Sequence, residues 1–181
     1  MIIQGNDILR AFASDPERGF RMLTRQAMRP LYWHIRRMVI SHHDAEDVLQ
    51  ETLVRAYRSL PSLRDGSTLA AWLYRIATNE ALRYVERNRR VVLALDPAPE
   101  EEAAMVAADE YVDYSDLEAV KLRDAVLSLP PRQQATFNLR YFDELEYSEI
   151  ASILECSEPT AKANYHFAKE KIKKYINSIS E

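Results

Sequence analysis

The sequence predicts an all-α protein made of two helical domains joined by an acidic linker, and three observations support this. Ala, Leu, Glu and Arg are abundant, whereas only 3 of the 181 residues are glycine, a composition that favours helices. Apolar residues recur every three or four positions in both halves of the chain. Between the halves, Leu95–Asp113 contains two prolines and many acids, which is typical of a linker. We predict domains at 1–92 and 115–181, with the linker at 93–114.

Composition also indicates the compartment. The single cysteine, Cys156, has no partner for an internal disulfide. No apolar run is long enough to span a bilayer, and the N-terminus MIIQGNDILRAF lacks the layout of a signal peptide. We therefore expect a cytoplasmic protein without membrane insertion.

Charge is strongly segregated along the chain. Residues 1–91 hold 15 arginines and 10 acids, a balance of +5, whereas residues 92–120 hold 9 acids and no base. Residues 121–181 hold 9 bases and 9 acids. Because binding follows local patches, the net charge of −4 does not exclude nucleic acid. The acidic segment is either a solvated charge run or a cover for basic surfaces when DNA is absent.

Helical patterning in the first domain begins at Pro16, which suits a first helical turn. Pro30 lies inside the pattern and predicts a kink or break near Arg29. Asp44 is expected to cap the next helix, and a turn-rich loop follows at Pro61–Thr68. The apolar stripes of the three predicted helices are Phe20, Leu23, Ala27, Leu31, Ile35 and Met38; Val48, Leu49, Leu53, Ala56, Tyr57 and Leu60; and Leu69, Leu73, Ile76, Ala77 and Tyr84.

The helix at 44–60 has a polar face away from its apolar stripe, formed by Asp47, Gln50, Glu51 and Val54. It is either a solvated face or an interface in which carboxylates and an amide fix the register of a basic partner helix. A metal site built from neighbouring ligands (His42, His43, Asp44, Asp47) is a third interpretation. Because the chain has only 4 histidines and no second cluster to complete a shell, we expect no metal.

The following helix has an arginine-rich face that includes an aromatic residue and an amide. Its members are Trp72, Arg75, Asn79, Arg83, Arg87 and Arg90. Cations hold phosphates, an aromatic ring stacks on bases, and Asn can read a base edge, so the face suits single-stranded or distorted DNA. The alternative is an amphipathic helix whose Trp72 packs against its neighbours.

The C-terminal segment contains YSEIASIL, ECSE and PTAKANYHFAKEKIKKYI, which indicate a short helix, a tight turn and a longer basic helix. This is the pattern of a helix-turn-helix, whose second helix lies in the major groove of DNA. Thr160 and Lys162 fall early enough in that helix to meet base edges.

The order of these motifs resembles an extracytoplasmic-function (ECF) sigma factor of bacterial RNA polymerase. The motifs are DAEDVLQETLVRAYRSL, then AAWLYRIATNEALRYVERNRR, then the linker, then LPPRQQATFNLRYFDELEYSEIASILECSEPTAKA. The resemblance covers roughly residues 15–178 and implies a sigma-2-like bundle followed by a sigma-4-like helix-turn-helix domain. It also implies core RNA polymerase, through its β′ clamp helices and β subunit, and promoter DNA as partners, with an anti-sigma factor as a further candidate.

The resemblance implies a role for each set of residues. The set expected to grip the clamp helices is Asp47, Gln50 and Glu51. The set expected to bind and melt the −10 element is Ser62, Leu63, Arg64, Asp65, Gly66, Ser67, Thr68, Trp72, Arg75, Asn79, Arg83, Arg87, Arg89 and Arg90. The set expected at −35 DNA is Arg140, Thr160, Lys162, Ala163, His166 and Phe167. Asn164 joins it because its amide can pair with adenine.

Several positions depart from the family pattern. Leu63 and Leu69 replace loop aromatics, and a non-glycine residue stands near Glu155, where the turn favours glycine. Asn164 and Phe167 stand where basic residues are common, so we expect fewer phosphate contacts.

Two other functions compete with an initiation factor. One is a two-domain helix-turn-helix regulator that does not bind core polymerase. The other is a metal-dependent hydrolase using His42, His43, Asp44 and Glu46, which lacks a nucleophile and enough ligands. We expect neither catalysis nor a cofactor.

Overall fold

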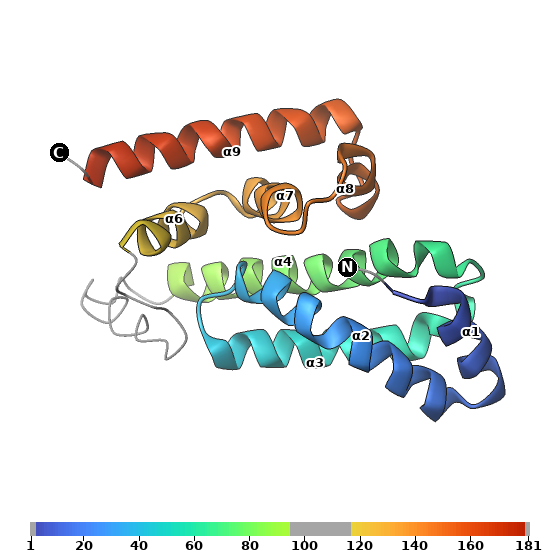
Figure 1. Ribbon diagram of the computed structural model, residues 1–181. Helices are drawn as coiled ribbons and strands as arrows, with labels where there is room; N and C mark the ends of the chain where they lie inside the picture. The colour runs from blue at the N-terminus through green and yellow to red at the C-terminus, as the bar shows by residue number, and fades with distance from the viewer. Residues whose placement is uncertain (1–2, 95–116, 180–181) are drawn as a thin grey trace.

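The computed structural model describes residues 3–94 and 117–179, and within them every regular element is a helix. The first body contains α1 (Gly5–Ser14), α2 (Pro16–Arg36), α3 (His42–Ser59), the short 3₁₀ turns η1 (Leu60–Ser62) and η2 (Gly66–Thr68), and α4 (Leu69–Ala94). The second contains α6 (Leu117–Leu127), α7 (Pro131–Tyr141), α8 (Tyr147–Ile153) and α9 (Glu158–Ile179). Figure 1 shows the second body lying along α4. The all-α prediction is confirmed; most of the predicted linker lies outside the described residues.

Helix starts follow local chemistry, with one correction. Asp15 caps α2, its carboxylate accepting from the Arg18 backbone N–H, and Pro16 occupies the first turn. At α3 the predicted cap was wrong: the Ser41 hydroxyl accepts from the Asp44 backbone N–H at 3.0 Å. Asp44 instead places a carboxylate in the first turn, where the positive end of the helix dipole stabilises its negative charge.

Pro30 does not end α2, which continues as one helix to Arg36. The apolar side chains on either side of it explain why, since Leu23, Ala27, Leu31 and Ile35 are all fully buried. Packing of this face holds the helix together despite the missing backbone donor.

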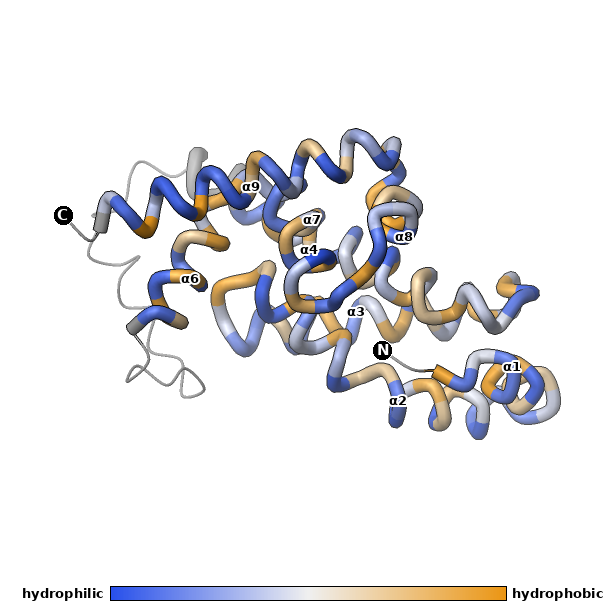
Figure 2. The backbone as a smooth tube through the Cα atoms, turned by 45° about the horizontal axis from the view of Figure 1, so that its top comes forward, coloured by the Kyte–Doolittle hydropathy of each residue, from blue (hydrophilic) through white to orange (hydrophobic). Residues whose placement is uncertain are grey.

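The core of the first body continues into the second. The buried cluster centred on α2, α3 and α4 also includes Leu139, Ile150 and Ile153 from α7 and α8. A separate small core, including Phe137, Ala168 and Ile172, joins α6, α7 and α9. Figure 2 shows apolar and polar residues alternating along the helices, as expected where each helix buries one side.

Polar groups also join the two bodies. The Asp143 carboxylate, 5% exposed, lies 2.6 Å from His34 Nδ1 and 2.6 Å from the Arg37 guanidinium. With Nδ1 protonated, His34 donates to Asp143 and its Nε2 accepts from the Thr78 hydroxyl at 2.9 Å. The Asn138 amide donates to the Arg37 backbone oxygen at 3.2 Å.

Among the described residues, no helix combines the length and apolar character needed to cross a membrane.

Candidate functional site

The polar face of α3 is fully available for contact. Asp47, Gln50 and Glu51 are exposed, because the opposite side of α3 buries Ala45, Val48, Leu49, Thr52 and Ala56. Asp47 lies 3.8 Å from His43 one turn earlier, and this weak surface pair leaves the carboxylate accessible. The structure therefore brings these three side chains together, as the helical spacing predicts.

A groove lies beside this face, and the wall that α2 contributes to it was not predicted from the sequence. Its volume is about 630 Å³, and α3 lines it with Asp47, Leu49, Gln50 and Leu53 together with His43 and Glu46. The opposite wall comes from α2. Its residues are Met28, Arg29 and Tyr32. A signal was present in the sequence: Met28 falls on the polar side of α2, and it is 46% exposed.

The two histidines at the start of α3 each lie close to an acid of the same helix. His42 lies 3.2 Å from Glu46, and His43 pairs separately with Asp47. In the described part of the chain, no group of three or more His, Cys, Asp or Glu residues has the geometry to hold a metal ion.

The loop between α3 and α4 is built from its own hydrogen bonds. The Asp65 carboxylate accepts from the Ser67 backbone N–H at 2.9 Å and from the Ser67 hydroxyl at 2.7 Å, and these bonds lower the Asp65 pKa. The Thr68 hydroxyl donates to the Asp65 backbone oxygen. The side chains left exposed are Ser62, Arg64, Asp65, Ser67 and Thr68.

Two loop residues predicted to face DNA have supporting positions instead. Leu63 is half-buried and packs against the main core, so this leucine anchors the loop where the family commonly has an aromatic residue. Gly66 is buried against α1, where its backbone N–H donates to the Asn6 side chain at 3.2 Å. A Cβ on Gly66 would overlap the backbones of Gly5 and Asn6, so this close approach requires glycine.

The predicted melting face of α4 lies outward, with its members exposed to different degrees. Trp72, Arg75 and Asn79 are half-buried, whereas Arg83 and Arg87 are exposed. Trp72 packs against the main core at the same time, as the packing interpretation of this residue predicts. Arg89 and Arg90 lie in α4, but their side chains are outside the described residues.

An acid sits among the cations of this face. Glu80, whose side chain is 10% exposed, binds Arg55 at 2.8 Å and Arg83 at 2.5 Å. The three line a cleft of about 450 Å³ between α3 and α4, together with Glu51 and Asn79. The polar face of α3 and the arginine-rich face of α4 therefore border one another.

The second body contains the predicted helix-turn-helix. Glu146 and Glu149 form a capping box at the start of α8. Glu155 adopts φ 51°, so the predicted unfavourable backbone at the turn is present. Ser157 directly precedes α9 and caps it, its hydroxyl accepting from the Thr160 backbone N–H at 3.2 Å.

The early turns of α9 present the predicted reading face. Ala161, Ala168 and Ile172 are buried, and on the other side the exposed residues are Thr160, Lys162, Ala163, His166 and Phe167. Asn164 is half-buried at the edge. Phe167 is 53% exposed, so its ring is available for contact with a partner.

Two basic residues near this face have internal partners that the sequence did not indicate. The Arg140 guanidinium donates to the Leu145 backbone oxygen at 2.8 Å and lies over the Tyr147 ring, so it braces α7 against the start of α8. Lys162 lies 2.7 Å from Glu158, and this hydrogen bond raises the Lys162 pKa.

These features together define a class: an all-helical factor with a helical bundle followed by a helix-turn-helix body. The comparisons agree. Sigma-70 region 2 matches residues 23–91, and Sigma-70, region 4 matches residues 119–172. The chain belongs to the sigma-70 family of factors, in its extracytoplasmic-function group.

Similar curated proteins cover about three quarters or more of the chain. The RNA polymerase sigma-H factor of Pseudomonas aeruginosa is 27% identical, over 97% of this chain and 95% of that protein. The ECF RNA polymerase sigma-E factor of Haemophilus influenzae is 31% identical, over 77% of this chain and 78% of that protein.

Solved structures share the fold. The sigma factor RpoE in complex with the anti-sigma factor NepR, from Bartonella quintana, gives a TM-score of 0.69 at 22% identity, covering 87% of this chain and 96% of that one. CnrH in complex with the cytosolic domain of CnrY gives 0.67 at 21% identity, covering 96% and 97%.

Proposed function

We propose that this protein is a non-enzymatic, cytoplasmic initiation factor that binds core RNA polymerase and directs it to promoters. The carrying observation is that three surfaces follow one another in the order that the family models match: the exposed acidic face of α3, the loop and partly exposed face of α4, and the exposed face of α9. Domains at 1–92 and 115–181 would contain these faces, and both family matches fall within them.

Core polymerase is proposed to dock on α3. Asp47 and Glu51 supply negative charge and Gln50 a hydrogen-bonding amide, and all three are exposed on one side of a helix whose other side is buried. Such a surface suits a partner helix with basic side chains, because complementary charges set both the rate of encounter and the register. The neighbouring groove supplies apolar contacts from Met28 and Leu53.

Promoter DNA is proposed to bind at two places. The start of α9 would enter the major groove at −35, where Thr160 and Lys162 reach base edges or phosphates and Phe167 meets thymine methyl groups. The exposed loop residues and the α4 face would hold the separated −10 strand, with Trp72 against a base and Asn79 at a base edge.

Binding both elements at once requires the two bodies to separate. Promoter elements near −10 and −35 are about 25 base pairs apart, or roughly 85 Å along duplex DNA, whereas α4 is only about 39 Å long. Here α7 and α8 pack on α4. We therefore propose that core polymerase holds the bodies apart in the working complex. Both solved relatives are complexes with a second protein, which supports an anti-sigma factor as another partner.

The test is co-purification with core RNA polymerase, comparing wild type with Asp47→Lys/Glu51→Lys. The variant should lose binding at least tenfold, because two attractive contacts become repulsive, and it should keep its thermal melting temperature, because both positions are exposed. A folded wild type that does not bind core polymerase would instead support the helix-turn-helix regulator.

A further inference from the structure

One face of α2 carries four exposed arginines, Arg18, Arg21, Arg25 and Arg29, which we call the arginine row. Their spacing of three and four residues keeps them within about 80° around the helix and spreads them over about 16 Å of its length. The opposite face buries Leu23, Ala27 and Leu31, so the row is directed outward.

Some other arginines of this body have acidic partners, whereas Arg58, Arg64, Arg75 and Arg87, like the row, have none among the described residues. Arg10 binds Asp7, and Arg55 and Arg83 share Glu80. Within the part of the chain that the structure describes, no guanidinium of the row makes a hydrogen bond or an ion pair. Cations one turn apart on a helix repel each other. Four of them without an ion pair among the described residues suggest that the neutralising charge comes from another molecule.

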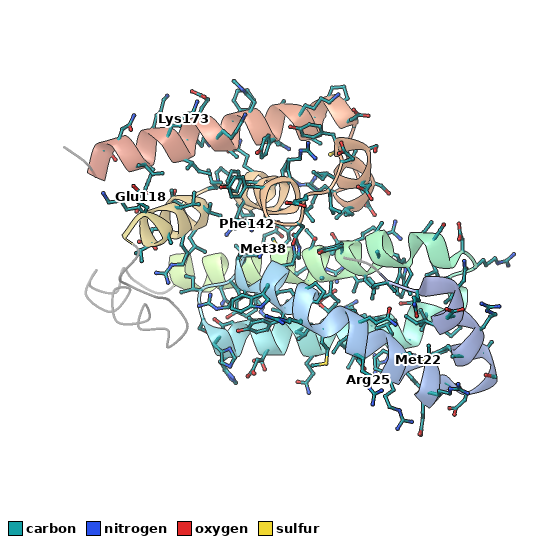
Figure 3. The ribbon with its side chains drawn as sticks, viewed as in Figure 1. Met22, Arg25, Met38, Glu118, Phe142 and Lys173 are labelled. Atoms are coloured by element: carbon teal, nitrogen blue, oxygen red, sulfur yellow. The ribbon has the colours of Figure 1, made fainter. Side chains whose placement is uncertain are left out.

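The row is continuous with the groove between α2 and α3. Arg29 ends the row and also lines the groove, facing the wall that contains Asp47 and Gln50. The groove therefore has one arginine on its α2 wall and two carboxylates, Glu46 and Asp47, on its α3 wall. Figure 3 shows Arg25 and Met22 on the side of the molecule away from α9, where Lys173 is labelled.

We propose that the arginine row docks an acidic surface of core RNA polymerase, next to the polymerase segment that enters the groove. This rests on the proposed function and extends its docking site from α3 to the length of α2. A polymerase element with basic side chains toward α3 and acidic side chains toward α2 satisfies both walls. The reversed orientation places like charges together, so the two walls fix polarity as well as affinity.

A protein surface fits better here than nucleic acid. The α4 face lies on the far side of the helix from the residues that α4 buries, Leu73, Ala77 and Ala81, and the arginine row likewise faces away from the shared core. Among the described residues, no arginine of the row lines the clefts that border the α4 face. The row also has adaptable apolar neighbours, since Met28 is 46% exposed and Met22 is half-buried, and methionine suits packing against protein side chains.

The experiment measures the affinity of the full-length protein for purified core RNA polymerase. The variant is Arg18→Glu/Arg21→Glu/Arg25→Glu, which leaves the groove residue Arg29 intact. The matched control, Lys169→Glu/Lys171→Glu/Lys174→Glu, changes the net charge equally on exposed positions of α9. At about 50 mM salt we expect the α2 variant to bind at least tenfold more weakly and the control to stay within about twofold, with the gap narrowing at higher salt.

The possible results distinguish failure of the arginine-row proposal from failure of the proposed function. Equal core binding by the α2 variant, the control and wild type overturns the arginine row while leaving the α3 interface standing. Normal core binding with weakened promoter DNA binding by the α2 variant overturns it in favour of nucleic acid. Absence of core binding by wild type overturns both proposals. If the triple variant fails to fold, Arg21→Gln/Arg25→Gln provides the same comparison without charge reversal.

Discussion

Replacing Asp143 with alanine tests what holds the two bodies together. The carboxylate is 5% exposed and accepts from His34 and Arg37 at 2.6 Å each. Its removal leaves a guanidinium 24% exposed without its counter-ion. Breaking a buried pair from one side costs about 3–5 kcal/mol. Because Arg37 keeps some water, we expect about 3 kcal/mol, roughly a 150-fold shift in an equilibrium.

The shift should appear as separation of the bodies rather than as unfolding, because separation returns His34 and Arg37 to water. Small-angle X-ray scattering should show a larger radius of gyration for Asp143→Ala, while circular dichroism shows unchanged helix content. Glu118→Ala serves as the control, since Glu118 is an exposed acid of the second body. Identical scattering profiles for all three proteins would refute the role given to Asp143.

Three further predictions concern single side chains. Glu155→Gly relieves a non-glycine residue at φ 51° and should raise the free energy of unfolding by up to about 1 kcal/mol in urea titrations. The control Ser152→Gly, in α8, should lower the free energy of unfolding by about 0.5 kcal/mol. Equal effects of the two substitutions would contradict backbone strain at Glu155. Trp72→Ala should spare core binding and reduce promoter opening, measured by permanganate reactivity of the −10 region, unless the ring serves packing alone. Burial, together with the hydrogen bond to Asp44, raises the Tyr84 pKa to about 12. As pH rises, the unfolded chain loses the tyrosine proton before the folded protein does, so the free energy of unfolding should fall between about pH 10 and 12. The fall should be less steep in Tyr84→Phe, which has no phenol proton to lose.

The sequence predicted α2, α3, α4, α8 and α9 from their apolar periods and end signals, whereas it did not predict α1, α6 or α7 as separate helices. The start of α2 at Pro16 and the positive φ at Glu155 both follow from local rules of backbone chemistry. The cap of α3 was assigned to Asp44 rather than Ser41. Both residue types cap helices well, and only the observed hydrogen bond separates them.

Contacts between distant segments could not be predicted in the same way. His34 is fully buried because Asp143, 109 positions later, provides its partner, and no local pattern links the two. The same holds for the α2 wall of the groove, whose Met28 and Arg29 meet α3 only after folding. Residues predicted from one helix face were thus placed correctly on that face, while residues whose position depends on a second helix were missed.

The contact between Gly5 and Gly66 couples the beginning of the chain to the loop proposed to read the −10 element. Because neither position has room for a Cβ, the two backbones touch directly, and movement of α1 is transmitted to the loop without a compliant side chain between them. Exchanging the loop alone between relatives would therefore separate it from the surface that shapes it. Transferring the −10 preference from one relative to another should require exchanging α1 together with the loop. A rigid fusion at the N-terminus should alter promoter choice even though it adds no contact with DNA.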